Sequence, residues 1–355
     1  MSGQTAPSPV ATPGAVTRHW RGRLRRRTAV VCGSLAALVL ALFVTALLLG
    51  EAGLSPAEVL SAFTGSADRI TAYVVLELRL PRAAAAAVVG ACLGASGAVF
   101  QSVVRNPLAS PDIVGITAGA GFAGVLAVLV LHLSGLGLSL AVIAGGLLAA
   151  VSVALLTWRR GIHGLRLVLV GIGVAALATA LTSYLMTTVD VREAGVAYTW
   201  LVGSLAGASW PIVTITLVLA VAAFTALAAR VRSLRALELG DATATALGFR
   251  VERDRIVVLL IATVLAAVAV GASGPIPFVA LMAPQIARRL VGRTSVSLTA
   301  AAATGAAVVS AADLLAQYAV PGISFPVGVV TGVVGAPYLA WLLARSNRTR
   351  SGGTT

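Results

Sequence analysis

The sequence predicts an all-α polytopic membrane protein with about ten transmembrane helices and an inverted internal repeat. The first observation is composition: of the 355 residues, 58% are hydrophobic and 11% are charged, whereas charged residues make up about a quarter of a typical soluble domain. The second is that apolar runs of about 20 residues, long enough to cross a bilayer as a helix, recur from Thr28 to Ala344. The third is a short motif found once in each half of the chain.

The apolar runs divide the chain into three parts. Residues 1–27 are rich in proline, glycine, serine and threonine and end in "RHWRGRLRRR", which is typical of a disordered arm, here on the cytoplasmic side. Residues 28–345 form the membrane domain, and residues 346–355 form a cytoplasmic tail. Within the membrane domain we expect spans at about 28–50, 80–104, 113–133, 136–157, 166–188, 210–231, 254–273, 276–291, 296–317 and 326–344.

Arginine sets the orientation of these spans, because all 26 basic residues are arginine. With the N-terminus in the cytoplasm, only Arg69, Arg79, Arg82 and Arg192 lie outside, and the other 22 lie in cytoplasmic segments. Basic residues in short loops favour the cytoplasmic side, so both chain ends are predicted to be cytoplasmic. Membrane orientation therefore accounts for the net charge of +14. We expect membrane lipid, and no nucleic acid, as a partner of these arginines.

The absence of lysine bears on whether this chain can hydrolyse ATP itself. The phosphate-binding loop of ATPases needs a lysine, so this chain contains no standard one and is not expected to be an enzyme; any ATP hydrolysis belongs to another subunit. His19, His132 and His163 lie far apart, and Cys32 and Cys92 lie in separate apolar runs. We therefore predict no metal site, no disulfide and no cofactor.

A repeat links the two halves of the chain. "GASG" occurs at residues 94–97 and again at 271–274, and at the same offset Pro107 matches Pro284. The predicted spans around the two copies run in opposite directions, which indicates inverted repeats of the kind common among transporters. Close helix packing by small residues is a second, compatible interpretation. The eighth span, which contains Pro284, is short and is expected to lie between other helices.

The stretch "FQSVVRNPLASPDIVGITAGAGF", residues 100–122, interrupts the apolar sequence with prolines and polar residues. In lipid, every freed backbone group needs a hydrogen-bonding partner, so this break predicts a turn surrounded by protein. Pro107 cannot donate a backbone hydrogen bond and is expected to end the preceding helix. Asp112 is expected to cap the next one.

Several long motifs then resemble one family. "RLPRAAAAAVVGACLGASGAVFQSVVRNPLASPDIVGITAGA", "YTWLVGSLAGASW", "LELGDATATALGFRVERDR", "SGPIPFVALMAPQIARRLVG" and "FPVGVVTGVVGAPYLAWLL" follow one another in this order. They resemble the FecCD family, the membrane permeases of ABC importers for ferric siderophores, haem and cobalamin. The resemblance covers about residues 30 to 345. It implies a ten-span fold in the bacterial cytoplasmic (inner) membrane.

The resemblance also implies partners. A second permease subunit, either an identical copy or a related paralogue, would place the transport path on the dimer axis. ATP-binding cassette ATPase subunits would bind on the cytoplasmic side, and a substrate-binding protein would dock outside. The docking residues implied are Arg79 and Arg82, although each alone also fits an interfacial arginine or a partner for Glu77. Gln317 stands where another docking arginine is usual.

Two further sets of residues follow from the resemblance. The cytoplasmic gate would comprise Asn106 and Leu108 with Gly164 and Leu165, the latter pair standing where small polar residues are common. The segment "ALELGDATATALGF" has a helical pattern that Gly248 is expected to end. Similar permeases have two short coupling helices there, and the residues implied in ATPase coupling are Leu239, Gly240, Asp241, Ala244, Leu247 and Gly248.

The function expected is therefore a permease subunit that moves a ferric siderophore into the cytoplasm. A haem or cobalamin importer is an alternative. An ion-coupled secondary transporter would need carboxylates within the membrane, and only Asp313 is near such a position; we expect a hydrogen-bonding role for it, since no cationic partner is close in sequence. A scaffold without transport leaves the coupling segment and the gate turn unexplained. Gln285 occupies a position where a histidine is common.

Overall fold

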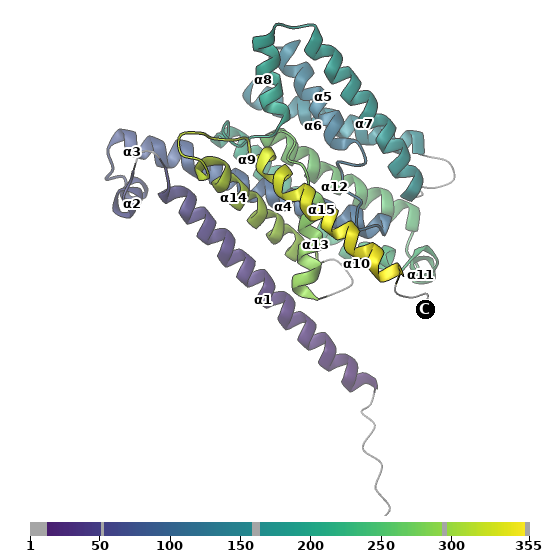
Figure 1. The fold of residues 1–355 in the computed structure, drawn as a ribbon. Helices are drawn as coiled ribbons and strands as arrows, with labels where there is room; N and C mark the ends of the chain where they lie inside the picture. Colours follow the sequence, from purple (N-terminus) through teal and green to yellow (C-terminus); the bar gives the residue numbers. More distant parts are fainter. Residues whose placement is uncertain (1–12, 51–52, 158–163, 293–296, 352–355) are drawn as a thin grey trace, which may run out of the picture.

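The computed structural model describes residues 13–50, 53–157, 164–292 and 297–351. In this part of the chain the secondary structure is helical, apart from one isolated β-bridge between Val320 and Ile323. The predicted all-α polytopic fold is confirmed (Figure 1).

The helices follow one another in the order α1 (Pro13–Leu48), α2 (Pro56–Thr64), α3 (Arg69–Tyr73), the π-helix η1 (Val74–Arg79), α4 (Leu80–Val104), α5 (Ile116–Leu129), α6 (Gly135–Thr157), α7 (Gly164–Thr187), α8 (Val191–Leu201), α9 (Trp210–Ala229), α10 (Val231–Glu238), α11 (Asp241–Ala246), α12 (Val251–Ser273), α13 (Val279–Val291), α14 (Leu298–Tyr318) and α15 (Val327–Ser351).

Each predicted span contains a helix. Among the described residues, seven helical segments are long and apolar enough to cross a membrane: the apolar part of α1, the continuous helix from α3 through η1 to α4, and α6, α7, α9, α12 and α14. The other three spans correspond to the short helices α5 and α13 and to the apolar part of α15, Val327–Leu342. Residues Val279 to Gln285 of α13 are all buried, so the short eighth span does lie between other helices, as expected.

The short helices gather at the two ends of the bundle. Helices α2 and α3 lie at one end, called here the α2 end, and α10 and α11 lie at the other, called here the α11 end (Figure 1). Helix α2 begins with a capping box, in which Ser55 and Glu58 hydrogen-bond each other's backbone N–H. The backbone N–H and hydroxyl of Ser55 donate to the Glu58 carboxylate and lower its pKa.

The helical structure extends further at both chain ends than predicted. Helix α1 begins at Pro13 rather than near residue 28, and α15 continues to Ser351; the expected disorder of the arm is therefore wrong for residues 13–27. Proline suits the first turn of a helix, and no other proline follows before the membrane span. Likewise, residues 346–351 contain no glycine or proline to stop α15.

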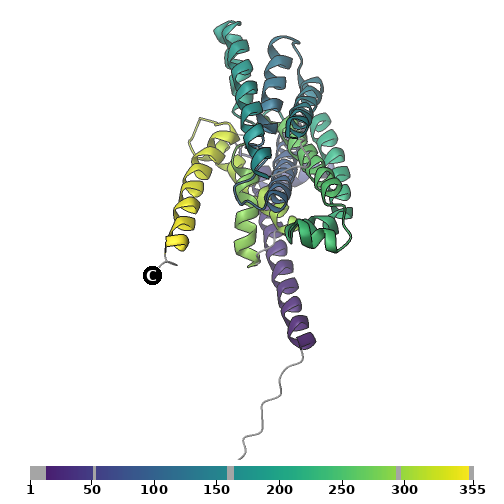
Figure 2. The ribbon, with the colours of Figure 1, turned by 90° about the vertical axis from the view of Figure 1, so that its right-hand side faces the viewer.

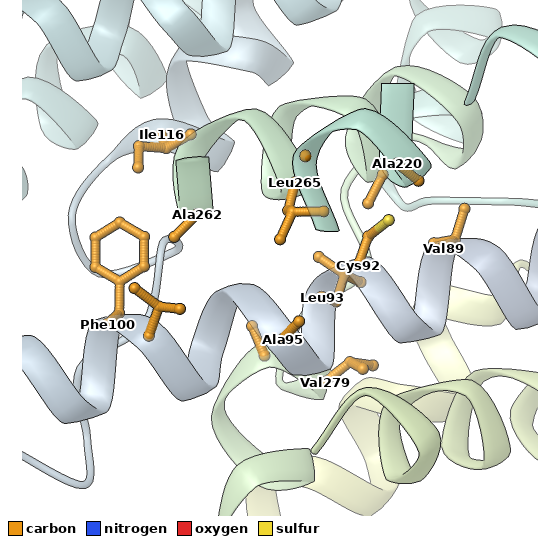
Figure 3. Close-up of a cluster of buried hydrophobic side chains, with 14 of the residues drawn as sticks. Val89, Cys92, Leu93, Ala95, Phe100, Ile116, Ala220, Ala262, Leu265 and Val279 are labelled. Carbon is orange, nitrogen blue, oxygen red and sulfur yellow. The ribbon is translucent and has the colours of Figure 1, made fainter. Parts of the chain in front are cut away.

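Helix α4 lies at the centre of the fold. Figure 3 shows its side chains Val89, Cys92, Leu93 and Phe100 between residues of α5, α9, α12 and α13. Its glycines face neighbouring backbones directly: a Cβ at Gly90 would collide with the carbonyl of Gly305 in α14. By contrast, α15 packs on α14 and α13 at the edge and stands away from the other helices (Figure 2).

The two copies of the repeated motif differ in local structure. Pro107 lies in the turn after α4, whereas the matching Pro284 lies inside α13. Gly97 is in the interior of α4, while Gly274 has φ +67° and directly follows α12. The glycines of the first copy serve close packing, which supports that interpretation of the motif; the inverted relation of the two halves stays a prediction.

Replacing Gly97 by leucine is expected to prevent stable folding. A Cβ at this position would overlap the backbone carbonyl of Ala280 in α13, and a fixed backbone cannot move aside as a flexible side chain can. Overpacking typically costs about 1–3 kcal/mol, and more where backbones collide. The measurement is the apparent melting temperature of the purified protein in detergent.

The control is Gly33→Leu in α1, where a Cβ meets no atom within 4 Å. This variant should melt at the same temperature as the wild type. An equal fall of the melting temperature in both variants would contradict the packing argument.

Candidate functional site

The turn between α4 and α5 is the first component of the site. Arg105 ends α4 in the left-handed conformation, with φ 54°. The side-chain oxygen of Asn106 accepts a hydrogen bond of 2.9 Å from the Leu108 backbone N–H, and its carbonyl accepts one from Ala109. This Asx-type turn leaves Asn106 and Pro107 exposed and Leu108 half-buried. The two gate residues predicted here thus lie on a tight, defined turn at the α11 end.

The start of α5 differs from the prediction. Gly115, with φ +83°, is the N-cap residue, and Asp112 instead accepts a hydrogen bond of 2.5 Å from the Thr117 hydroxyl. The expected cap at Asp112 is therefore wrong, because the chain makes a further turn before the helix begins. At Gly115 a Cβ would lie 2.7 Å from the carbonyl oxygen of Gly171 in α7. The turn is braced against α7 at this point.

The second predicted gate segment lies mostly outside the described residues. Residues 158–163 are not described, and α7 begins at Gly164, with Leu165 in its first turn. The side chains at these two positions are not described either. The meeting of Gly164 and Leu165 with the α4–α5 turn stays a prediction.

The predicted coupling segment forms two short helices, as the family resemblance implied. Gly240, with φ 101° and ψ 156°, separates α10 from α11, and Gly248, with φ +84°, follows α11. The predicted stop at Gly248 agrees with this geometry. Glycine alone readily adopts the backbone region that Gly240 occupies. Both helices lie at the α11 end (Figure 1).

The predicted coupling residues face in two directions. Leu239 and Leu247, on either side of α11, are 64% and 59% exposed. They give the surface at the α11 end two apolar contact points. Ala244 is fully buried and holds α11 against the bundle. Asp241, the first residue of α11, is half exposed.

Side-chain hydrogen bonds join α10 and α11 to the end of α4 and the turn after it. Asp241 accepts a hydrogen bond of 2.9 Å from Arg105 and two of 2.8 Å from Arg255 of α12. Glu238, at the end of α10, accepts one of 2.7 Å from the Ser102 hydroxyl in the last turn of α4. Sequence reasoning missed Arg105, Glu238 and Arg255. Their only sequence signal was a charge next to a predicted turn or helix end.

A second polar cluster lies behind the turn. The Gln285 amide donates to the side-chain oxygen of Gln101, at 2.7 Å, and to the backbone carbonyl of Pro107, at 3.0 Å. Arg288 also donates to the Gln101 oxygen, and the Gln101 amide donates to the Leu281 carbonyl. Gln101 and Gln285 are buried. The glutamine that stands where a histidine was expected therefore ties the turn to α13.

At the α2 end, both predicted docking arginines have partners within the chain. Arg79 donates to the carbonyls of Leu47 and Leu48 at the end of α1, at 2.7 and 3.4 Å. Arg82 donates hydrogen bonds to both carboxylate oxygens of Asp313, the shortest at 2.9 Å. Their side chains are neither fully buried nor freely extended. A bidentate pair of this type fixes the guanidinium in one plane.

Asp313 has the cationic partner that the sequence did not reveal. Its side chain is 3% exposed against 20% for Arg82, and the two residues are 231 positions apart. Gln317, where a further docking arginine was expected, donates to Asp313 at 2.8 Å. The hydrogen-bonding role expected for Asp313 agrees with these contacts, and its cationic partner comes from a distant part of the sequence, because the fold brings α4 and α14 together.

No group of histidine, cysteine or carboxylate residues able to hold a metal occurs among the residues that the structure describes. Residues 38–345 match the model of the FecCD transport family. The chain belongs to this family.

Relatives in the family match along nearly the whole chain. The ferric enterobactin transport system permease protein FepG of Escherichia coli (strain K12) is 41% identical over 324 residues, which are 91% of this chain and 98% of that protein. The achromobactin transport system permease protein CbrC of Dickeya dadantii (strain 3937) is 40% identical, covering 92% and 96%. An inward-facing structure of a metal-chelate type ABC transporter has a TM-score of 0.79 and 30% identity, covering 89% and 99%.

Removing Asp313 is expected to destabilise the protein. The variant Asp313→Ala leaves the Arg82 guanidinium without its partner where it is largely shielded from water, and breaking a buried pair costs about 3–5 kcal/mol. The apparent melting temperature in detergent should therefore fall, and Arg82→Ala combined with Asp313→Ala should recover part of the loss. Arg69→Ala, which removes an exposed arginine at the same end, serves as the control. If the double variant melts below Asp313→Ala, the pairing argument fails.

Proposed function

We propose that this chain is the permease subunit of an ABC importer that carries a ferric siderophore into the cytoplasm. The observation that carries the proposal is its similarity, along nearly the whole of both chains, to permeases of ferric enterobactin and achromobactin transport systems. The likeness to a metal-chelate type transporter agrees in fold and in cargo class. Haem and cobalamin are the alternative cargoes.

The orientation proposed places the α11 end in the cytoplasm of a bacterium, with the protein in the inner membrane. Arginine supports it: Arg105, Arg250 and Arg253, at the α11 end, belong to the majority of arginines that favour the cytoplasmic side. Both chain ends are then cytoplasmic, and the α2 end, with Arg79 and Arg82, faces outward toward a substrate-binding protein. Charge pairs at such a surface would favour docking rate and register.

Transport is proposed to be driven by separate ATPase subunits bound at the α11 end. The chain contains no lysine for a phosphate-binding loop. The exposed leucines Leu239 and Leu247 would insert into the ATPase surface, and the inward contact of Ala244 would carry the movement of that surface into the bundle. Gly240, Asp241 and Gly248 shape the two helices. A second permease subunit would complete the path.

The proposed cytoplasmic gate is built from Asn106 and Leu108 with Gly164 and Leu165. The exposed Asx-type turn after α4 is short and held at defined points, so it has the properties of a segment that closes and opens as one unit. The bracing of Gly115 against α7 supports a shared movement of the two gate segments.

The cargo is tested by uptake in an iron-starved strain that lacks this gene. Radioactive ferric enterobactin, ferric achromobactin, haem and cobalamin are supplied separately, with and without the wild-type gene. Selective restoration of a ferric siderophore is expected. Restoration of haem or cobalamin alone would reassign the cargo, whereas uptake that depends on the ion gradient and persists without ATPase subunits would indicate a secondary transporter.

Replacing Gly240 by valine is expected to abolish ATP-driven uptake while the protein still inserts into the membrane. A side chain at φ 101° and ψ 156° costs about 1–3 kcal/mol in backbone strain, so α10 and α11 would change their relative direction. The measurements are uptake and the amount of protein in the membrane fraction. Gly207→Val, at an exposed glycine where an added Cβ would meet no atom within 4 Å, should transport normally. Loss of insertion in Gly240→Val would instead assign the glycine a purely structural role.

A further inference from the structure

The contacts between α11 and the α4–α5 turn form a chain of charged residues with one fixed end. Arg255, in the first turns of α12, is buried and anchors the Asp241 carboxylate through two hydrogen bonds. The same carboxylate reaches Arg105, which is half exposed. Arg105 is the last residue before the gate turn and is held in the left-handed conformation. A shift of Asp241 thus acts on the backbone directly preceding Asn106.

A second contact runs parallel to the first. Glu238, at the end of α10, accepts a hydrogen bond from the Ser102 hydroxyl in the final turn of α4. Gly240 lies between Glu238 and Asp241 and would bring an added Cβ within 3.3 Å of an Arg105 nitrogen. The two acidic residues therefore flank the break between α10 and α11, and both hydrogen-bond to residues at the end of α4.

The inner side of the turn is held differently. The Pro107 carbonyl accepts a hydrogen bond from Gln285 of α13, within a buried cluster that includes Gln101. The turn is thus bound on one side to the short helices at the surface and on the other to a buried helix.

The ion pair between Arg105 and Asp241 has little use as a stabilising contact. Both side chains are half exposed, and such pairs contribute little to stability because water and salt screen them. Its value lies in geometry, since it is a direct side-chain connection from the coupling helix to the residue before the gate. We propose that Arg105 is a positioning residue, which transmits the movement of α11 through Asp241 to the α4–α5 turn and so couples ATPase closure to the gate.

This inference rests on the proposed function, and its test separates the two. The variant Arg105→Gln is assembled with the ATPase subunits in proteoliposomes. ATP hydrolysis is measured together with uptake of the ferric chelate whose transport the wild-type gene restores in the uptake test above. Assembly and hydrolysis should persist while uptake falls about tenfold, a loss typical of coupling between sites. Arg253→Gln removes the same charge from an exposed residue of α12 and should transport like the wild type.

A double-variant comparison asks whether the two residues act as one connection. If Arg105 and Asp241 act through each other, Arg105→Gln combined with Asp241→Asn should lose no more uptake than the more affected single variant. Losses that multiply, or normal uptake by Arg105→Gln, would overturn the inference but leave the proposed function intact. Loss of ATPase assembly by Arg105→Gln would also overturn it. Absence of uptake by the wild type would overturn the proposed function instead.

The movement of the turn has a readout that needs no cargo. Asn106→Cys in the assembled complex is labelled with a maleimide with and without ATP, and the parent protein corrects for labelling of the native cysteines. The labelling rate should change with ATP in the wild-type background and become insensitive to ATP when Arg105→Gln is added. An equal response in both backgrounds would show that the turn moves without this connection.

Discussion

The rest of the structure depends on the contact between α4 and its neighbours at backbone distance. Gly90 and Gly305 lie face to face, and Gly97 lies against Ala280, with no room for a methyl group at any of these points. This packing makes α4 a fixed central rod. Arg82 lies near one end of α4 and Arg105 at the other, so the same interface fixes the distance between the two ends where the docking and gate residues are predicted.

Much of the fold follows from the sequence because the membrane imposes length and polarity on each span. A helix across lipid must satisfy its own backbone and remain apolar for about 20 residues, which located the ten helical regions and both sides of the break at Pro107. The turn itself could be predicted for the same reason. The start of α1 could not be predicted in this way, because the arginine-rich segment is polar but contains nothing that stops a helix.

The connections of the candidate site lie beyond such reasoning. The partners Arg82 and Asp313 are 231 residues apart, and Arg105 and Asp241 are 136 apart; composition and periodicity do not determine which faces of two helices meet. Gly240 illustrates a different obstacle, because glycine occurs both within helices and at breaks. The pattern of residues 236–249 does not by itself locate the break between the two short helices that the resemblance implied. In the structure the break lies at Gly240, and Ala244 of α11 is buried.

The pairing of Arg82 with Asp313 also bears on how the protein is made. At a synthesis rate of about 5–20 residues per second, the arginine leaves the ribosome roughly 10–50 s before its carboxylate partner, given the 231 residues between them. During that interval Arg82 is without this partner, and a long arginine side chain can keep its charge near water at the membrane boundary. A truncated chain that lacks α14 therefore leaves the Arg82 charge without its carboxylate partner.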